Sequence, residues 1–240
     1  MISSPVFSNS PNAVVIDVRP GLTLHEVAVD LAAATSDAYA SQFLAAAQHA
    51  ATTSPFSPNG SLEGLIGYGQ YVIASGESPA HLVKRMQRQF VAEATQAGIK
   101  PGSTINGLSA YQAIIAASID EKEGYYPKNM PQVARVILNR LARHAGFQMD
   151  ATILYALGMD GGTVTPAMLR IHSPYNTYLN AGLTPTPICV VSSYAMRAIV
   201  NPPQGTWYYF TLVSRDGTEA FATTFQQQLA NERLAASRGL

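Results

Sequence analysis

Residues 109–124 read SAYQAIIAASIDEKEG, a stretch that predicts the central helix of the fold and ends in a candidate functional site. The run from Ala113 to Ile119 is apolar on all sides, which predicts a helix buried inside the protein. Three carboxylates follow directly, on Asp120, Glu121 and Glu123. Carboxylates in the last turn of a helix face the negative end of its macrodipole, which is unfavourable. A segment that breaks a local rule in this way is a candidate functional site.

Helix geometry places Glu123 on the face of Ala116 and Ile119, whereas Glu121 points roughly to the opposite side. A carboxyl group held against apolar walls has a raised pKa and can stay protonated as a general acid near neutral pH. The same pattern is more often a solvated helix end on which Lys122 pairs with a carboxylate. The pattern alone therefore leaves both interpretations open.

Outward from this segment, helical and strand patterns mix without a repeating strand–helix–strand order, so we expect an α+β fold. Upstream we expect a strand at 14–18, a helix capped by Thr23 and Glu26, an Ala-rich helix at about 36–51, a weak strand at 68–73 and a helix that starts at Ser78. Downstream we expect helices that start near Pro131 and at 151–157, 166–170 and 193–200, a hairpin of strands 207–213 and 219–221, and a polar helix from Thr224.

The expected division of the chain has three parts. Residues 1–12 are rich in Ser, Pro and Asn, which predicts a disordered lead-in. The turn-rich stretch 98–106 is the main expected boundary. It separates a small strand-and-helix module with connecting helices, 13–104, from a second domain of mixed helices and antiparallel strands, 105–240, which carries the chemistry.

The composition excludes several classes of function. Lys and Arg together number 15, as do Asp and Glu, so the neutral chain has no general attraction for nucleic acid. The single cysteine, Cys189, excludes an intramolecular disulfide and a Cys-based zinc site. No glycine-rich phosphate loop, GxSxG or HExxH motif is present, and we expect neither a metal nor a cofactor. No apolar run reaches the roughly 20 residues that span a bilayer.

Two polar segments are candidates for binding a ligand. Residues 172–178, HSPYNTY, predict a rigid loop whose amide, hydroxyl and phenol groups suit sugars. Residues 148–152, QMDAT, place Asp150 either as the N-cap of the next helix or on a polar wall of a cleft. An ordinary structural turn remains the alternative for the first segment, and simple capping for the second.

Five blocks between about 105 and 225 read LSAYQAIIAASIDEKEG, MPQVARVILNRL, QMDATILYALG, IHSPYNTYLNAGLTPTPI and WYYFTLVSRDGTEAFATT. Taken together, they resemble the MltG/YceG family of endolytic murein transglycosylases. The SPYNTY motif among these neighbours is specific, and the blocks come in the order of the family. Less tightly, DVRPGLTLHEVAVDLA near the N-terminus resembles the LysM-like module of the family, a small βααβ unit associated with glycans.

The resemblance implies a catalytic role for Glu123. The family cleaves the β-1,4 bond between N-acetylmuramic acid and N-acetylglucosamine and leaves a 1,6-anhydro-muramic acid end, with one Glu acting first as acid and then as base. The expected substrate-binding residues are Gln148, Asp150, Thr152, Ser173, Tyr175, Asn176 and Tyr178. Glu121 and Arg140 are expected to have secondary roles.

By the same resemblance, the partners are peptidoglycan glycan strands and, further, cell-wall synthases, with no nucleic acid. The catalytic part is expected on the wall-facing side of the bacterial cytoplasmic membrane. A single-pass anchor outside these 240 residues would provide the membrane contact.

Three segments depart from the pattern of the family: Gly67–Tyr71, Val190–Ser192 and the pair Gln227-Gln228. The last two are expected near the cleft, so a catalytically weak or inactive glycan-binding scaffold for cell-wall synthases is the main alternative function. A cytosolic α+β protein without a glycan partner is a third possibility that the sequence leaves open.

Overall fold

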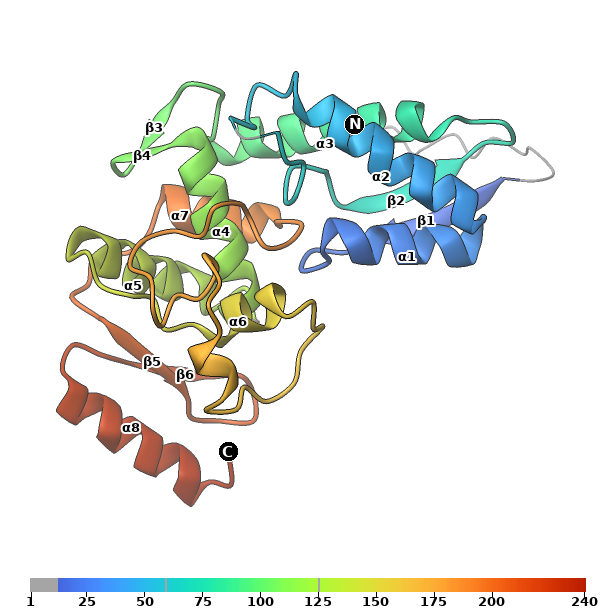
Figure 1. The fold of residues 1–240 in the computed structure, drawn as a ribbon. Coiled ribbons are helices and arrows are strands. Elements are labelled where there is room, and N and C mark those ends of the chain that lie inside the picture. Colours follow the sequence, from blue (N-terminus) through green and yellow to red (C-terminus); the bar gives the residue numbers. More distant parts are fainter. Residues whose placement is uncertain (1–12, 59, 125) are drawn as a thin grey trace.

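The computed structural model describes residues 13–58, 60–124 and 126–240, and it has an α+β fold in which helices pack with three small antiparallel sheets (Figure 1). The predicted lead-in 1–12 lies outside the described residues. Among the described residues, no helix combines the length and apolar character needed to cross a membrane.

The N-terminal part follows the order that the sequence predicts. It consists of β1 (Val14–Val18), α1 (Leu24–Ala34), α2 (Asp37–Ala51), β2 (Gly69–Ile73) and α3 (Pro79–Ala97). Strands β1 and β2 pair antiparallel, and Thr23 and Glu26 form the predicted capping box of α1. This βααβ order is the one expected of a LysM-like module, although that assignment stays a prediction.

The rest of the chain surrounds α4. Its elements are β3 (Thr104–Ile105), β4 (Leu108–Ser109), α4 (Ala110–Glu123), α5 (Met130–Ala142), α6 (Asp150–Ala156), the 3-10 helix η1 (Met168–Arg170), α7 (Ser193–Val200), β5 (Tyr209–Leu212), β6 (Glu219–Ala222) and α8 (Phe225–Ser237). The β3–β4 hairpin was not predicted, because two-residue strands in a turn-rich stretch have no alternating pattern to reveal them.

Helix α4 is the central element, as its apolar run predicts. Ser109 caps it with Gln112 in a capping box, and α5, α6 and α7 pack against it. Residues Ala113 to Ile119 are between 0% and 3% exposed. Because the helix is enclosed along its length, its last turn delivers the acidic residues from a rigid support.

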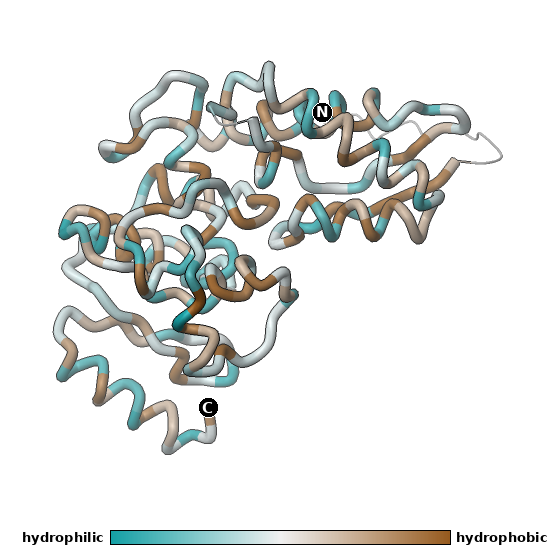
Figure 2. Tube along the Cα trace, viewed as in Figure 1, coloured by the Kyte–Doolittle hydropathy of each residue, from teal (hydrophilic) through white to brown (hydrophobic). Residues whose placement is uncertain are grey.

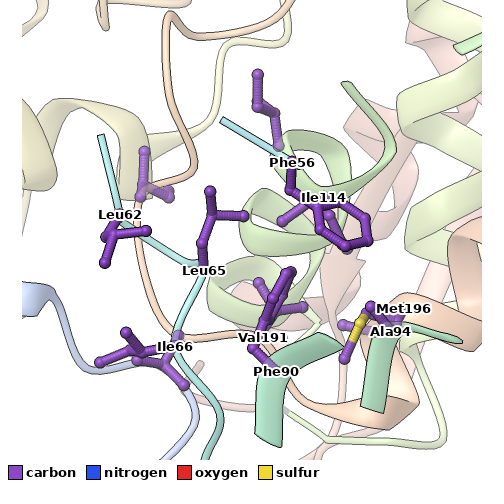
Figure 3. Packing of buried hydrophobic residues seen from close by; sticks show 14 of the residues in the cluster. Phe56, Leu62, Leu65, Ile66, Phe90, Ala94, Ile114, Val191 and Met196 are labelled. Carbon is purple, nitrogen blue, oxygen red and sulfur yellow. The ribbon is translucent and has the colours of Figure 1, made fainter. Parts of the chain in front are cut away.

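One hydrophobic core joins the two parts that the sequence predicts (Figure 3). Phe56 and Phe90 from the N-terminal part pack edge to face, with ring centroids 5.2 Å apart. Ile114 of α4, Val191 and Met196 belong to the same cluster. Residues on both sides of the expected boundary at 104/105 therefore pack in the same cluster. Burying each large side chain contributes about 1.5–3 kcal/mol to the stability of the folded state.

The C-terminal elements lie at the edge of the molecule (Figure 1). Strands β5 and β6 form the predicted hairpin, and α8 packs along its outer side. Hydrophilic residues are spread along α8 in Figure 2, which agrees with its peripheral position. The hairpin also contacts α5, and its residues border the acidic end of α4.

Candidate active site

The candidate active site lies where α4 ends. Asp120 is fully buried, whereas Glu121, Lys122 and Glu123 are half-buried. A Cβ atom at Gly124 would come within 2.8 Å of Met130 Cγ. Only a glycine therefore fits where the chain leaves α4, and this tight turn holds Glu123 at the boundary between core and solvent.

The environment of Glu123 favours its protonated form near neutral pH. Burial raises the pKa of this carboxyl group to about 7, and the negative charge of Asp150 adds to the rise. The backbone N–H of Ala151 donates to Oε1 at 3.1 Å, and this bond and the charge of Arg140 oppose the shift. The prediction of a carboxyl group with a raised pKa at this position is confirmed.

Two adjoining depressions share Glu123 and Lys122, and we call them together the groove. One, of about 480 Å³, lies between the end of α4 and the β5–β6 hairpin and is lined also by Tyr126, Phe210, Thr211, Leu212, Arg215, Gly217 and Glu219. The other, of about 590 Å³, extends towards residues 19–22 and α6 and includes Asp150, Ala151 and Leu154. Glu123 thus has room for a ligand on either side.

Asp150 and Tyr178 are brought next to Glu123. The phenol of Tyr178 donates to Asp150 Oδ1 at 2.6 Å, and the pKa of Tyr178 is raised by burial and by the charges of Asp150 and Glu123. The prediction that Asp150 caps the following helix is wrong. Asp150 is the first residue of α6, and the carboxylate of Glu123 supplies the acceptor for the N–H of Ala151.

Asn176 and Thr152, both predicted to bind substrate, are fully buried. The Asn176 amide donates to the carbonyls of Leu169 and Ile171 and accepts from the N–H of Tyr178. Thr152 donates to the carbonyl of Met149 and bonds the hydroxyl of Thr177 at 2.9 Å. These side chains hold the 172–178 loop in place, and their burial gives no support to a direct contact with substrate.

The other predicted binding residues lie away from Glu123. Ser173 and Tyr175 line a separate cleft beside the end of α6, whereas the groove residue Asp150 is the first residue of that helix. Gln148 is exposed, has φ 50°, and donates its N–H to the carbonyl of Thr177. Of the predicted set, only Asp150 and Tyr178 thus accompany Glu123, and the binding roles of the rest stay predictions.

Arg140 supports the site from α5. Its guanidinium donates to the carbonyls of Tyr208 and Phe147 and lies 5.5 Å from the ring centroid of Tyr209. Burial lowers the pKa of Arg140, and the nearby Glu123 acts in the opposite direction. Arg140 therefore ties α5 to the strand and the loop that flank Glu123.

The segment Val190–Ser192, one of the departures, fastens the N-terminal loop to the site. Val190 exchanges backbone hydrogen bonds with Gly21 and Leu22, at 2.8 and 2.7 Å. The N–H of Ser192 donates to Glu121 Oε2 at 2.8 Å. Glu121, predicted to have a secondary role, thus anchors this segment to the end of α4, and burial raises its pKa.

The other departures lie farther out. Gln227 closes the capping box of α8, and Gln228 donates to the hydroxyl of Thr211, a residue of the groove, at 2.6 Å. Residues 67–71 lead into β2, where the hydroxyl of Tyr71 donates to the carbonyl of Gly67. Of these two departures, only the pair Gln227-Gln228 reaches the groove, through the contact of Gln228.

Two acidic residues near Glu123 were not predicted as site residues. Glu219 on β6 borders the groove, and burial and the charge of Glu123 raise its pKa to about 7. Asp120 is fully buried, and its pKa is raised well above the ordinary value by burial and by the charges of Glu121, Glu219 and Glu123. The acidic position of Glu219 on a strand of the predicted hairpin is the signal that could have revealed it.

Within the described part of the chain, no three His, Cys, Asp or Glu side chains gather in a way that could hold a metal ion. The groups that the site presents are its carboxyl groups, with the phenol of Tyr178 and the guanidinium of Arg140 beside them.

The family model described as the YceG-like family matches residues 3–234. The chain belongs to the YceG-like family. A solved structure of a yceG-like protein from Listeria monocytogenes superposes with a TM-score of 0.76 at 25% sequence identity, covering 90% of this chain and 75% of that one. The fold that places Glu123 is therefore shared with another YceG-like protein.

Two relatives of this YceG-like chain are named endolytic murein transglycosylase. The one from Bacillus subtilis (strain 168) is 34% identical over 134 residues, which is 55% of this chain and 37% of that protein. The one from Streptococcus pneumoniae serotype 2 is 32% identical over 120 residues, 48% of this chain and 22% of that protein. The matched region thus covers less than half of the length of either relative.

Proposed function

We propose that this YceG-like chain cleaves peptidoglycan glycan strands at internal bonds, as a lytic transglycosylase. One observation carries the proposal: Glu123, half-buried and with its pKa raised to about 7, lies between two depressions that it shares. The relatives named endolytic murein transglycosylase support the same substrate. A ligand site on both sides of the acid suits a bond inside a chain rather than at its end.

The proposed reaction needs one carboxyl group. Protonated Glu123 gives its proton to the glycosidic oxygen of the β-1,4 bond between N-acetylmuramic acid and N-acetylglucosamine, and the C1–O bond breaks. The resulting carboxylate then takes the proton of the C6 hydroxyl as that oxygen bonds to C1. Glu123 is protonated again, no water is consumed, and the new end is 1,6-anhydro-muramic acid. Ordinary glycosidases need a second carboxyl group because water is their final acceptor.

Asp150 and Tyr178 have supporting roles in this proposal. The Asp150 carboxylate, held by the phenol of Tyr178 at 2.6 Å, places a fixed negative charge beside Glu123. That charge keeps the proton on Glu123 before the reaction and stabilises positive charge that develops at C1. Both effects favour the first step, in which the glycosidic oxygen is protonated and the C1–O bond breaks.

The site of action follows from the substrate. We propose that the chain faces the cell wall and is held at the cytoplasmic membrane by an anchor outside this sequence, with cell-wall synthases as partners. Fractionation of cells that make the full protein, and its co-purification with synthases, would test the anchor and the partnership separately from the activity.

The activity is tested by incubating the purified protein with sacculi and analysing the muropeptides by mass. We expect anhydro ends from the native chain and a loss of at least about 100-fold in Glu123→Gln, because general acid–base catalysis contributes that much or more. Asp30→Asn, an exposed change on α1, is the matched control and should keep full activity. Binding to sacculi without any product would instead indicate the glycan-binding scaffold.

A further inference from the structure

A third depression, of about 460 Å³, has no part in the proposed reaction. We call it the tyrosine cleft, and it is lined among others by Thr23, His25, Tyr155, Met159, Ser173 and Tyr175. Its walls come from the start of α1, the end of α6 and the 172–178 loop. It is therefore built between the N-terminal part and the loop that also carries Tyr178.

Two tyrosines give the cleft a fixed aromatic wall. The rings of Tyr155 and Tyr175 are half-buried, with centroids 4.9 Å apart and planes at 55°. The hydroxyl of Tyr175 bonds that of Thr186 at 2.9 Å, and the hydroxyl of Tyr155 donates to Glu63 at 3.4 Å. Because protein partners hold both hydroxyls, the rings are oriented before a ligand arrives.

Glu63 lines the cleft and contacts two of its walls. It is 8% exposed, and Oε1 accepts the backbone N–H of Leu24 at 3.0 Å while Oε2 faces Tyr155. Glu63 thus links the first turn of α1 to α6, and burial raises its pKa to about 7. Such a link holds the two walls of the cleft at a constant separation.

The tyrosine cleft lies beside the groove, although the two have no lining residue in common. Leu22 and Leu154 line the groove, and their neighbours in the chain, Thr23 and Tyr155, line the cleft. A polymer that lies across Glu123 and follows α6 would therefore enter the cleft. The half-buried tyrosines, together with Ser173, His25 and Thr23, offer the aromatic and hydrogen-bonding groups that fit the apolar face and the polar rim of a sugar.

We propose that the tyrosine cleft binds an N-acetylated sugar residue of the same glycan strand, a few residues away from the bond that is cut. This inference rests on the proposed function for the identity of the strand. Occupation of the cleft holds a long strand against Glu123, so the enzyme prefers strands that reach both sites. A peptide stem is the competing occupant, and the experiment distinguishes the two.

The first measurement is binding of a tetramer of N-acetylglucosamine to Glu123→Gln, followed by NMR or calorimetry. We expect binding that weakens roughly 3- to 10-fold when Tyr155→Ala removes the aromatic wall, since an aromatic contact contributes about 0.5–1.5 kcal/mol. Met159→Trp, which fills the cleft from an exposed position, should weaken it similarly and serves if Tyr155→Ala does not fold. Tyr194→Ala, at an exposed tyrosine on α7, is the matched control and should bind normally.

The second measurement is the dependence of cleavage on strand length, with an active Glu123. For long strands, Tyr155→Ala or Met159→Trp should raise KM several-fold and leave kcat within about twofold, while short strands show no change. An unchanged KM for long strands and unchanged binding of the tetramer would overturn the cleft proposal while the enzyme remains active. An effect that vanishes once the peptide stems are removed enzymatically would also overturn it, in favour of the stem.

The two proposals fail separately. Tetramer binding that depends on Tyr155 in a chain without any cleavage activity would support the cleft and refute the proposed function. Normal cleavage without such binding would support the proposed function and refute the cleft proposal.

Discussion

Replacing Glu123 with Gln should stabilise the folded protein at alkaline pH, although it abolishes the proposed activity. A carboxyl group whose folded pKa lies above its unfolded value binds more protons in the folded state. The folded state therefore loses stability as pH rises from the unfolded pKa to the folded one. For Glu123 this window runs from about 4.5 to about 7. Below it the acid and the amide are both neutral, so the two proteins should be equally stable.

The size of the effect follows from the same shift. A change from 4.5 to about 7 corresponds to about 3 kcal/mol, at about 1.4 kcal/mol per pH unit. Solvent reaches the half-buried side chain, so this value is a ceiling, and we expect a gain of roughly 1–3 kcal/mol at pH 8. The amide oxygen of Gln can still accept the N–H of Ala151, so this contact of α6 is kept.

Urea unfolding of both proteins at about pH 4.5 and pH 8 measures this difference, with Asp30→Asn as the exposed control. The variant and the native chain should unfold together at the lower pH and separate at the higher one. Equal stability at pH 8, or a less stable variant, would refute the argument that burial keeps Glu123 protonated.

Three further substitutions test the surroundings of Glu123. Glu219→Gln should keep at least about a tenth of the activity, because the proposed chemistry needs one carboxyl group, whereas a two-carboxyl hydrolase would lose about 100-fold or more. Tyr178→Phe should cost about 1 kcal/mol of stability in urea unfolding and, if Asp150 acts at the transition state, roughly fivefold in kcat. Glu121→Ala should cost about 1–3 kcal/mol in the same assay, because the buried N–H of Ser192 loses its acceptor.

Each of these has an outcome that would count against it. A Glu219→Gln protein as inactive as Glu123→Gln would mean that both carboxyl groups react. If Tyr178→Phe left stability and kcat unchanged, the hydroxyl would have no role in holding Asp150. An unaltered midpoint for Glu121→Ala would show that the 190–192 segment is held by other contacts.

The central helix could be predicted because its signal is local. The apolar run from Ala113 to Ile119 and the cap at Ser109 fix α4 without information from elsewhere in the chain. The same run places Glu123 on its apolar face, but the pattern alone leaves open whether that carboxyl group is solvated or held against apolar walls. The central helix and the position of its last acid therefore depend on a few neighbouring residues.

The grouping of the remaining site residues could not be predicted, because it depends on contacts distant in the chain. The sequence predicts that the Asn176 amide binds a ligand, but the side chain is buried and makes hydrogen bonds to three backbone groups. The residues on either side of it therefore belong to different sites, Tyr178 beside the groove and Tyr175 in the tyrosine cleft. Asp150 reads as a cap, but Glu123, 27 positions earlier in the sequence, takes over that role. Glu219 reaches the groove only through the pairing of β5 with β6.

The most direct test of the central claim, that Glu123 alone lends and recovers a proton while the sugar supplies its own nucleophile, is cleavage in water enriched in heavy oxygen. We predict products with anhydro ends and no heavy oxygen, formed by the native chain and missing with Glu123→Gln. Heavy oxygen at the new sugar end, or unchanged cleavage by Glu123→Gln, would contradict the account.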